Sequence, residues 1–142
     1  MLKRDMDDRY EILPHTADIG VLARGDTLSD VIANTAYGMF DLMYDLSVVE
    51  PETTVVVEAA AETPPELLVD ALSELLASSE TENLAFVDFK VEIDDLRAVI
   101  TATGGPAAVV ELVGPPVKAV TYHDLRCEWT GSRWESRVIF DV

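Results

Sequence analysis

Apolar residues recur every three or four positions in two stretches of the chain, a spacing that predicts two amphipathic helices. The first helix runs from about residue 27 to residue 43. The second begins at Thr63 and ends before a polar loop at Ser78–Asn83. The apolar face of the first helix consists of Leu28, Val31, Ile32, Ala36, Met39, Phe40 and Met43. The apolar face of the second consists of Leu67, Leu68, Ala71, Leu72, Leu75 and Leu76.

Both helices carry a recognisable start signal. Thr63 is followed by Pro64, which suits the first helical position, and by Glu66 three residues on, a full capping-box pattern. Thr27 and Asp30 have the same spacing, although aspartate replaces the usual glutamate. These caps predict that the first turn of each helix forms where the apolar stripe begins.

Most of the remaining chain shows β-branched or alternating apolar residues and predicts strands. The turns between them are expected at Asp94-Asp95 and Thr130-Gly131-Ser132, and a chain break is expected at Gly104-Gly105-Pro106. Val109–Val113 is expected to be a short edge segment. The predicted strands cover residues 10–13, 19–23, 54–61, 87–93, 96–103, 118–129 and 134–141.

The predicted elements define an α+β fold. We expect one compact domain over residues 9–142, in which two amphipathic helices pack on a mostly antiparallel sheet. Residues 1–8 are expected to form a flexible acidic N-terminal tail. The 142 residues suit one hydrophobic core.

The chain is strongly acidic, with 27 acidic and 10 basic residues and a net charge of −17. This charge repels nucleic-acid phosphates and favours basic partners, so autonomous nucleic-acid binding is not expected. Adaptation to a salty cytoplasm explains the same charge equally well. No apolar segment is typical of a signal peptide or a membrane helix, so we expect a cytoplasmic protein without membrane contact.

Composition also limits which metal the chain can bind. Cys127 is the only cysteine, and His15 and His123 are the only histidines, so a typical structural zinc site is not expected. Oxygen ligands and a hard divalent cation are favoured instead, namely Ca²⁺, Mg²⁺ or Mn²⁺. Cys127 lies within a predicted strand and is expected to be a packing residue.

Carboxylates occur at two sequence-distant places that could share such a cation. Asp18 stands at the start of an apolar strand, where Gly20 leaves room for a second backbone to approach. Asp141 and the terminal Val142 end the last strand. The alternatives are a turn in which Asp18 accepts backbone N–H groups and a solvated strand end at Asp141.

Residues 117–123 contain two further functional candidates. Lys118 is positioned to pair with an acidic group or a phosphate, or to extend its side chain along the sheet. His123 shares a face with Ala119 and Thr121 on the predicted strand and is interpreted as a partly buried histidine. The sequence has no glycine-rich phosphate loop and no serine in a nucleophile-elbow context, so no catalytic residue is assigned.

The same segments resemble the archease family. The resemblance rests on YEILPHTADIG at residues 10–20, GDTL at 25–28, YGMFDLM at 37–43, VKAVTYH at 117–123 and VIFDV at 138–142, with the Leu67-Leu68 helix between them. It extends from about residue 9 to the end of the chain.

The resemblance implies a non-enzymatic activator of the RtcB-type RNA ligase in tRNA splicing. Such a protein promotes ligase guanylylation and multiple turnover, and it meets GTP only through the ligase. The resemblance places a divalent cation, Ca²⁺ first and Mg²⁺ or Mn²⁺ as alternatives, on the side chains of Asp18 and Asp141 and the main-chain oxygen of Val142. Lys118, His15 and His123 are its other functional candidates. The rival functions are a stand-alone metal-dependent phosphoester hydrolase and a metal-stapled, chaperone-like binding module.

Overall fold

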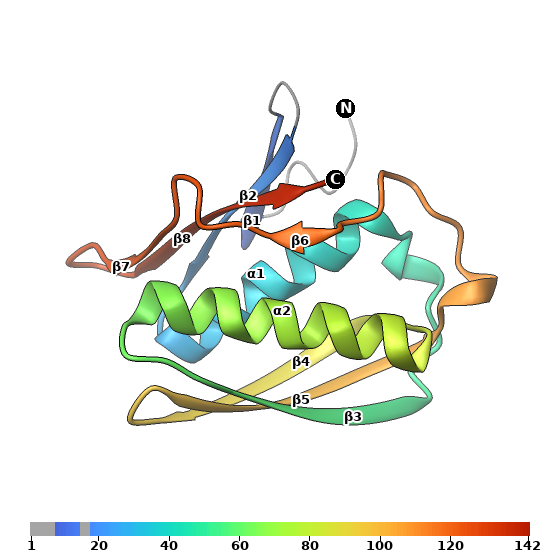
Figure 1. Ribbon diagram of the computed structural model, residues 1–142, viewed down its shortest axis with the longest axis horizontal. Coiled ribbons are helices and arrows are strands. Elements are labelled where there is room, and N and C mark those ends of the chain that lie inside the picture. The colour runs from blue at the N-terminus through green and yellow to red at the C-terminus, as the bar shows by residue number, and fades with distance from the viewer. Residues whose placement is uncertain (1–7, 15–17) are drawn as a thin grey trace.

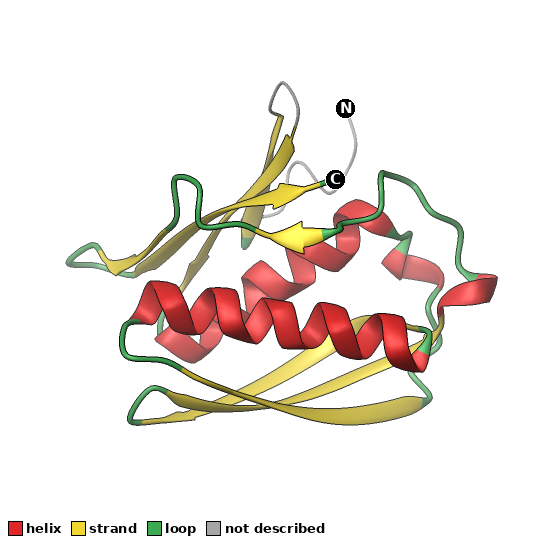
Figure 2. Ribbon diagram, in the orientation of Figure 1, coloured by secondary structure: helices red, strands yellow, loops and turns green. Residues whose placement is uncertain are grey.

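The computed structural model describes residues 8–14 and 18–142, which form two antiparallel sheets with two helices between them (Figures 1 and 2). All strand pairs are antiparallel. This confirms the predicted α+β fold with two amphipathic helices in one compact domain. The predicted N-terminal tail lies mostly outside the described residues.

The larger sheet has five strands. Its order is β1-β2-β8-β6, and β7 also pairs with β8. Its strands are β1 (Tyr10–Pro14), β2 (Asp18–Gly25), β6 (Ala119–Val120), β7 (Arg126–Trp129) and β8 (Trp134–Asp141).

The smaller sheet has three strands in the order β3-β5-β4. Its middle strand is joined to β4 by a two-residue turn at Asp95 and Leu96, both of which have positive φ angles. The predicted tight turn is therefore confirmed, but it lies one residue later than Asp94-Asp95 and includes Leu96. The strands are β3 (Thr53–Ala60), β4 (Leu84–Asp94) and β5 (Arg97–Pro106).

Two helices, α1 (Leu28–Met43) and α2 (Pro64–Glu82), fill the space between the sheets. Both predicted caps are present. The Thr27 side chain accepts from the Asp30 N–H, and the Thr63 side chain accepts from the Glu66 N–H and donates to its carboxylate. Two short 3₁₀ helices, Leu46–Val48 and Ala107–Val109, lie in the connections.

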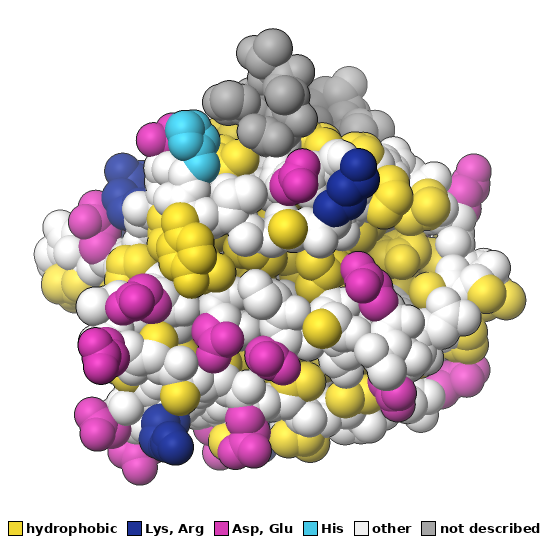
Figure 3. Space-filling view, in the orientation of Figure 1, with side chains coloured by type: hydrophobic (Ala, Val, Ile, Leu, Met, Phe, Trp, Pro, Cys, Tyr) yellow, Lys and Arg dark blue, Asp and Glu magenta, His cyan; other side chains and the backbone are white. Residues whose placement is uncertain are grey.

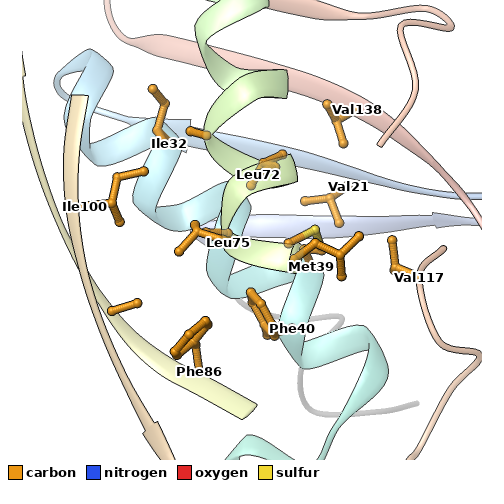
Figure 4. Packing of buried hydrophobic residues seen from close by; sticks show 14 of the residues in the cluster. Val21, Ile32, Met39, Phe40, Leu72, Leu75, Phe86, Ile100, Val117 and Val138 are labelled. Atoms are coloured by element: carbon orange, nitrogen blue, oxygen red, sulfur yellow. The ribbon is translucent and has the colours of Figure 1, made fainter. Parts of the chain in front are cut away.

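The core is built from side chains of both sheets and both helices (Figure 4). Val21 and Val138 approach from the five-stranded sheet, and Ile100 and Phe86 approach from the three-stranded sheet. Phe40 of α1 meets Phe86 edge-on, with ring centroids 5.4 Å apart. No helix in the described part of the chain has the length and apolarity needed to span a membrane.

Two predicted boundaries were wrong because tertiary contacts override the local signal. The polar segment Ser78–Asn83 continues α2 to Glu82, because Ser79 is buried and donates to the Leu84 carbonyl while Asn83 ends the helix in a left-handed conformation. Gly104-Gly105-Pro106 does not break the chain but belongs to β5, where the glycines pack closely against neighbouring backbone.

The predicted strand over residues 118–129 is interrupted. β6 and β7 both pair with the same edge of β8. Val120 pairs with Phe140 and Arg126 pairs with Arg137, so six residues of advance on one side match three on the other. The extra residues form a loop at 121–125, in which Asp124 has a positive φ angle. Val109–Val113 is likewise no regular strand, although Leu112 forms an isolated bridge with Tyr44.

Gly104 provides a test of the close packing in the three-stranded sheet. A Cβ atom at this position would lie 2.1 Å from the Ala85 oxygen and 2.9 Å from the Phe86 Cα, so backbone would have to move. We expect Gly104→Ala to lower the free energy of unfolding by about 2 kcal/mol or more, measured by urea denaturation.

The matched control is Thr103→Ala at the neighbouring, half-buried position, which removes a methyl group and an exposed hydroxyl contact with Thr54 and leaves the backbone spacing unchanged. It should change the free energy of unfolding by less than about 1 kcal/mol. Equal unfolding midpoints for the two variants would contradict the packing described for Gly104.

Candidate functional site

Three motifs that are distant in sequence meet at one end of the five-stranded sheet. Asp18, the first residue of β2, and Asp141, the last residue of β8, are Cα partners in the strand ladder. On the other side of β8, the Lys118 N–H donates to the Asp141 carbonyl at 2.8 Å. The C-terminus and the ends of β2, β8 and β6 are gathered in this region in Figure 1.

The hydrogen-bonding pattern defines how closely the two aspartate positions approach. Alternate residues of an antiparallel strand direct their N–H and C=O groups to opposite neighbours. Because the Asp141 carbonyl faces β6, Asp18 and Asp141 form a non-hydrogen-bonded pair across β2 and β8. Cα atoms in such pairs are ~4.5 Å apart, closer than in hydrogen-bonded pairs.

Gly20 supports this close pairing two residues along β2. A Cβ atom there would lie 2.7 Å from Ile139 Cδ1 and 3.0 Å from the Val138 carbonyl oxygen. The expected role of Gly20 in allowing another backbone to approach is therefore confirmed.

The groups around Asp141 suit an oxygen-ligated cation. The Asp141 side chain is exposed and makes no hydrogen bond or ion pair with any described side chain. Val142 is half-buried and packs against the hydrophobic core, which holds its main-chain oxygen near Asp141. Free carboxylate and main-chain oxygens are the ligands that Ca²⁺ and Mg²⁺ prefer.

The assignment of a cation remains a prediction. Within residues 8–14 and 18–142, no group of three or more histidine, cysteine or acidic side chains is arranged to hold a metal ion. His15 lies outside the described residues, and Asp18 is described only through its backbone. Lys118 is exposed, and no described carboxylate lies within ion-pair distance of its ammonium group.

His123 is not partly buried as expected. It lies in the loop between β6 and β7, and 62% of its side chain is exposed, with Nε2 3.5 Å from an Asp124 carboxylate oxygen. The prediction was wrong because it assumed an unbroken strand. Thr121 anchors the loop instead, since its N–H and hydroxyl both donate to the Ile139 carbonyl.

The geometry adds one feature to the site that residue types do not indicate. The main-chain N–H of Lys118 holds the Asp141 carbonyl, whereas sequence reasoning considered only the lysine side chain. This contact follows from the strand pairing alone, because a backbone hydrogen bond does not require a particular residue type. Lys118 is thus tied to the C-terminal strand through its backbone while its ammonium group stays exposed.

Comparison with known proteins assigns the family. Residues 10–142 match the model of the Archease protein family (MTH1598/TM1083). Protein archease of Methanosarcina acetivorans is 36% identical over 140 residues, covering 94% of this chain and 96% of that protein. Protein archease of Thermococcus gammatolerans is also 36% identical over 140 residues, covering 94% of this chain and 99% of that protein. The chain therefore belongs to the archease family.

Solved structures agree with the fold. The solution structure of Methanobacterium thermoautotrophicum protein 1598 matches with a TM-score of 0.78 at 33% identity, covering 96% of this chain and all of that one. The crystal structure titled as an archease, possible chaperone, from Thermotoga maritima matches with a TM-score of 0.64. At 18% identity over 92% of this chain and 94% of that one, the second match shows the fold alone.

Cys127 is a packing residue, as predicted. It is buried in β7 on the side facing the helices, and burial, followed by the charge of Glu128, raises the pKa of its thiol to about 12. The thiol therefore keeps its proton throughout the physiological range and is a poor nucleophile.

This pKa predicts slow alkylation of Cys127 by iodoacetamide in the native protein at mildly alkaline pH. The thiolate fraction is ~1000-fold smaller than for a thiol with its ordinary pKa of 9.0. The unfolded thiol ionises before the folded one, so the free energy of unfolding should fall as pH rises from about 9 towards 12. Mass spectrometry should detect rapid labelling only in denaturant, and rapid labelling of the native protein would contradict this assignment.

Proposed function

We propose that this protein is a non-enzymatic cofactor of the RtcB-type RNA ligase in tRNA splicing, promoting ligase guanylylation and multiple turnover. In this proposal a divalent cation binds the side chains of Asp18 and Asp141 and the main-chain oxygen of Val142. Membership of the archease family supports the proposal. The convergence of β2, β6 and β8 on Asp141 supports it independently.

The pairing of Asp18 with Asp141 is the observation that carries the proposal. Like charges directly opposite one another in an antiparallel pair destabilise the sheet, most of all at the close, non-hydrogen-bonded positions. A cation between the two carboxylates converts this repulsion into attraction. Since the available ligands are hard oxygens, Ca²⁺ is the first candidate, and Mg²⁺ or Mn²⁺ are alternatives.

Lys118 completes the proposed site. Its backbone is fixed next to Asp141, and its exposed ammonium group carries positive charge into a region of carboxylates. A lysine in this position is suited to contact a phosphate near the cation. The three side chains would act by orienting and stabilising charge in the ligase active site, without forming a covalent bond to the RNA.

The acidic surface supports docking to a basic partner. Acidic side chains are spread over the face shown in Figure 3, and basic ones are few there. With a net charge of −17, the domain is attracted to the positively charged surroundings of an active site that binds RNA. This attraction should weaken as salt concentration rises.

Ligation assays with RNA in excess over the cognate ligase test the proposed site. Asp18→Asn, Asp141→Asn and Lys118→Ala should each lower the stimulation of multiple turnover by about tenfold or more, the scale of a lost electrostatic contact. The matched controls are Asp94→Asn and Lys90→Ala, which change exposed residues of β4 in the other sheet. Normal stimulation by the three site variants would refute the mechanism.

A calcium titration of the isolated protein tests the cation separately. Calcium at about 100 times its dissociation constant should stabilise the wild-type fold by about 2.7 kcal/mol, seen as a higher Tm. The increase should be lost in Asp141→Asn and retained in Asp94→Asn. Calcium stabilisation combined with fully active site variants would instead favour the metal-stapled binding module. Turnover of a phosphoester without the ligase would favour the hydrolase.

A further inference from the structure

Basic residues are unevenly distributed between the two sheets. Of the eight lysines and arginines that the structure describes, only Lys90 and Arg97 belong to the three-stranded sheet. The other six lie on or beside strands of the five-stranded sheet and comprise Arg9, Arg24, Lys118, Arg126, Arg133 and Arg137. Most of the described basic residues of a very acidic molecule therefore lie with one sheet.

Two of these arginines face each other directly. Arg126 of β7 and Arg137 of β8 are Cα partners. The adjacent partners Cys127 and Ser136 are buried towards the helices, so the arginine pair lies on the opposite, outer face of the sheet. Like charges directly opposite one another destabilise a sheet, so this pairing is costly unless negative charge lies close to both guanidinium groups.

Neighbouring carboxylates compensate Arg126 but not Arg137. Arg126 forms ion pairs with Glu128, at 3.7 Å from its Nε, and with Glu135, at 3.9 Å from its Nη2, and both distances are longer than a hydrogen bond. The other carboxylate oxygen of Glu135 is held by Arg133 at 3.1 Å. The Arg137 guanidinium forms no hydrogen bond or ion pair with any residue in the described ranges.

The two arginines also share a depression in the surface. Asp124, Leu125, Arg126 and Arg137 line an open pocket of ≈ 450 Å³. It lies where the loop at residues 121–125 leaves the edge of β8, and its volume is sufficient for a phosphate group with an attached sugar. Asp124 is the one acidic residue in the lining, and its carboxylate lies 3.5 Å from His123 Nε2.

We propose that Arg126 and Arg137 form a binding site for a single phosphate group. A guanidinium presents a planar fork of N–H donors that matches phosphate oxygens. A carboxylate has two oxygens and satisfies one fork, whereas a phosphate monoester has three free oxygens and up to two negative charges and bridges two. This site goes beyond the proposed function, since it uses neither the ligase nor the Asp18–Asp141 pair.

The negative charge of the whole chain limits the site to short-range recognition. At −17 the molecule repels phosphates at a distance, and only direct contact with the two guanidinium groups offsets that repulsion. Affinity for phosphate should therefore rise with moderate salt that screens the long-range repulsion, and it should fall again when salt competes for the arginines.

The test is an NMR titration of the isolated protein in which the Nε–Hε resonances of its arginines are followed. The probes are inorganic phosphate, uridine 3′-monophosphate and a short RNA with a 3′-phosphate, each added at constant ionic strength against chloride. We expect saturable shifts at Arg126 and Arg137, with Arg137→Gln raising Kd at least about tenfold. The response of each probe shows whether the bound phosphate is free, in a nucleotide or at an RNA end.

Arg97→Gln is the matched control. Arg97 is an exposed strand arginine, whereas Arg137 is half-buried, and the Cα partner of Arg97 on β4 is Asp94 rather than another arginine. This variant should bind phosphate as the wild type does, and Arg137→Gln should keep its fold because it relieves a like-charge pair. Absence of saturable shifts with all three probes, or equal loss of binding in both variants, would overturn the proposal. Neither result depends on whether the protein stimulates an RNA ligase.

Discussion

Burial of both helices between the two sheets is the constraint on which the rest of the structure depends. The sheets do not hydrogen-bond to each other, so their relative position is determined by what α1 and α2 present to each side. Phe40 contacts the aromatic side chains of β4, while Thr35 bonds the buried Ser136 hydroxyl of β8 at 2.8 Å. Exposing a helix that is apolar around most of its circumference to water would be unfavourable. Both sheets therefore pack against the same layer of two helices.

The elements that the sequence predicted well are those with local signals. The two helix starts follow from Thr27 and Thr63, whose side chains cap the first turn, and the alternation around Phe89 predicts β4. The segments that failed depend on distant partners. The helix α2 continues through Ser79, whose hydroxyl donates a hydrogen bond to the Leu84 carbonyl. The strand β5 continues through Gly104, because the neighbouring backbone lies where a Cβ atom would otherwise be.

The candidate site was only partly accessible to sequence reasoning. Asp18 and Asp141 were singled out by the family resemblance, and the strand register adds that they are directly opposite. The Lys118 backbone contact depends on which carbonyl of β8 faces β6, and this cannot be read from residue types. The Arg126–Arg137 pair was missed although the predicted hairpin implies it. With Trp129 opposite Trp134 across the turn, Arg126 falls opposite Arg137, and the loop at residues 121–125 changes only the pairing of β6.

The surplus loop between β6 and β7 has a practical consequence. Because β6 and β7 are each anchored to β8 by their own pairing, the length of residues 121–125 is not set by the sheet. An insertion there would leave both ladders intact, and the turn already exposes His123 to solvent. A fluorophore attached at this point would lie between Asp141, at the end of β8, and Arg137, in the middle of that strand. One label could therefore report events at either end, provided that Asp124 and Leu125, which line the arginine pocket, are kept.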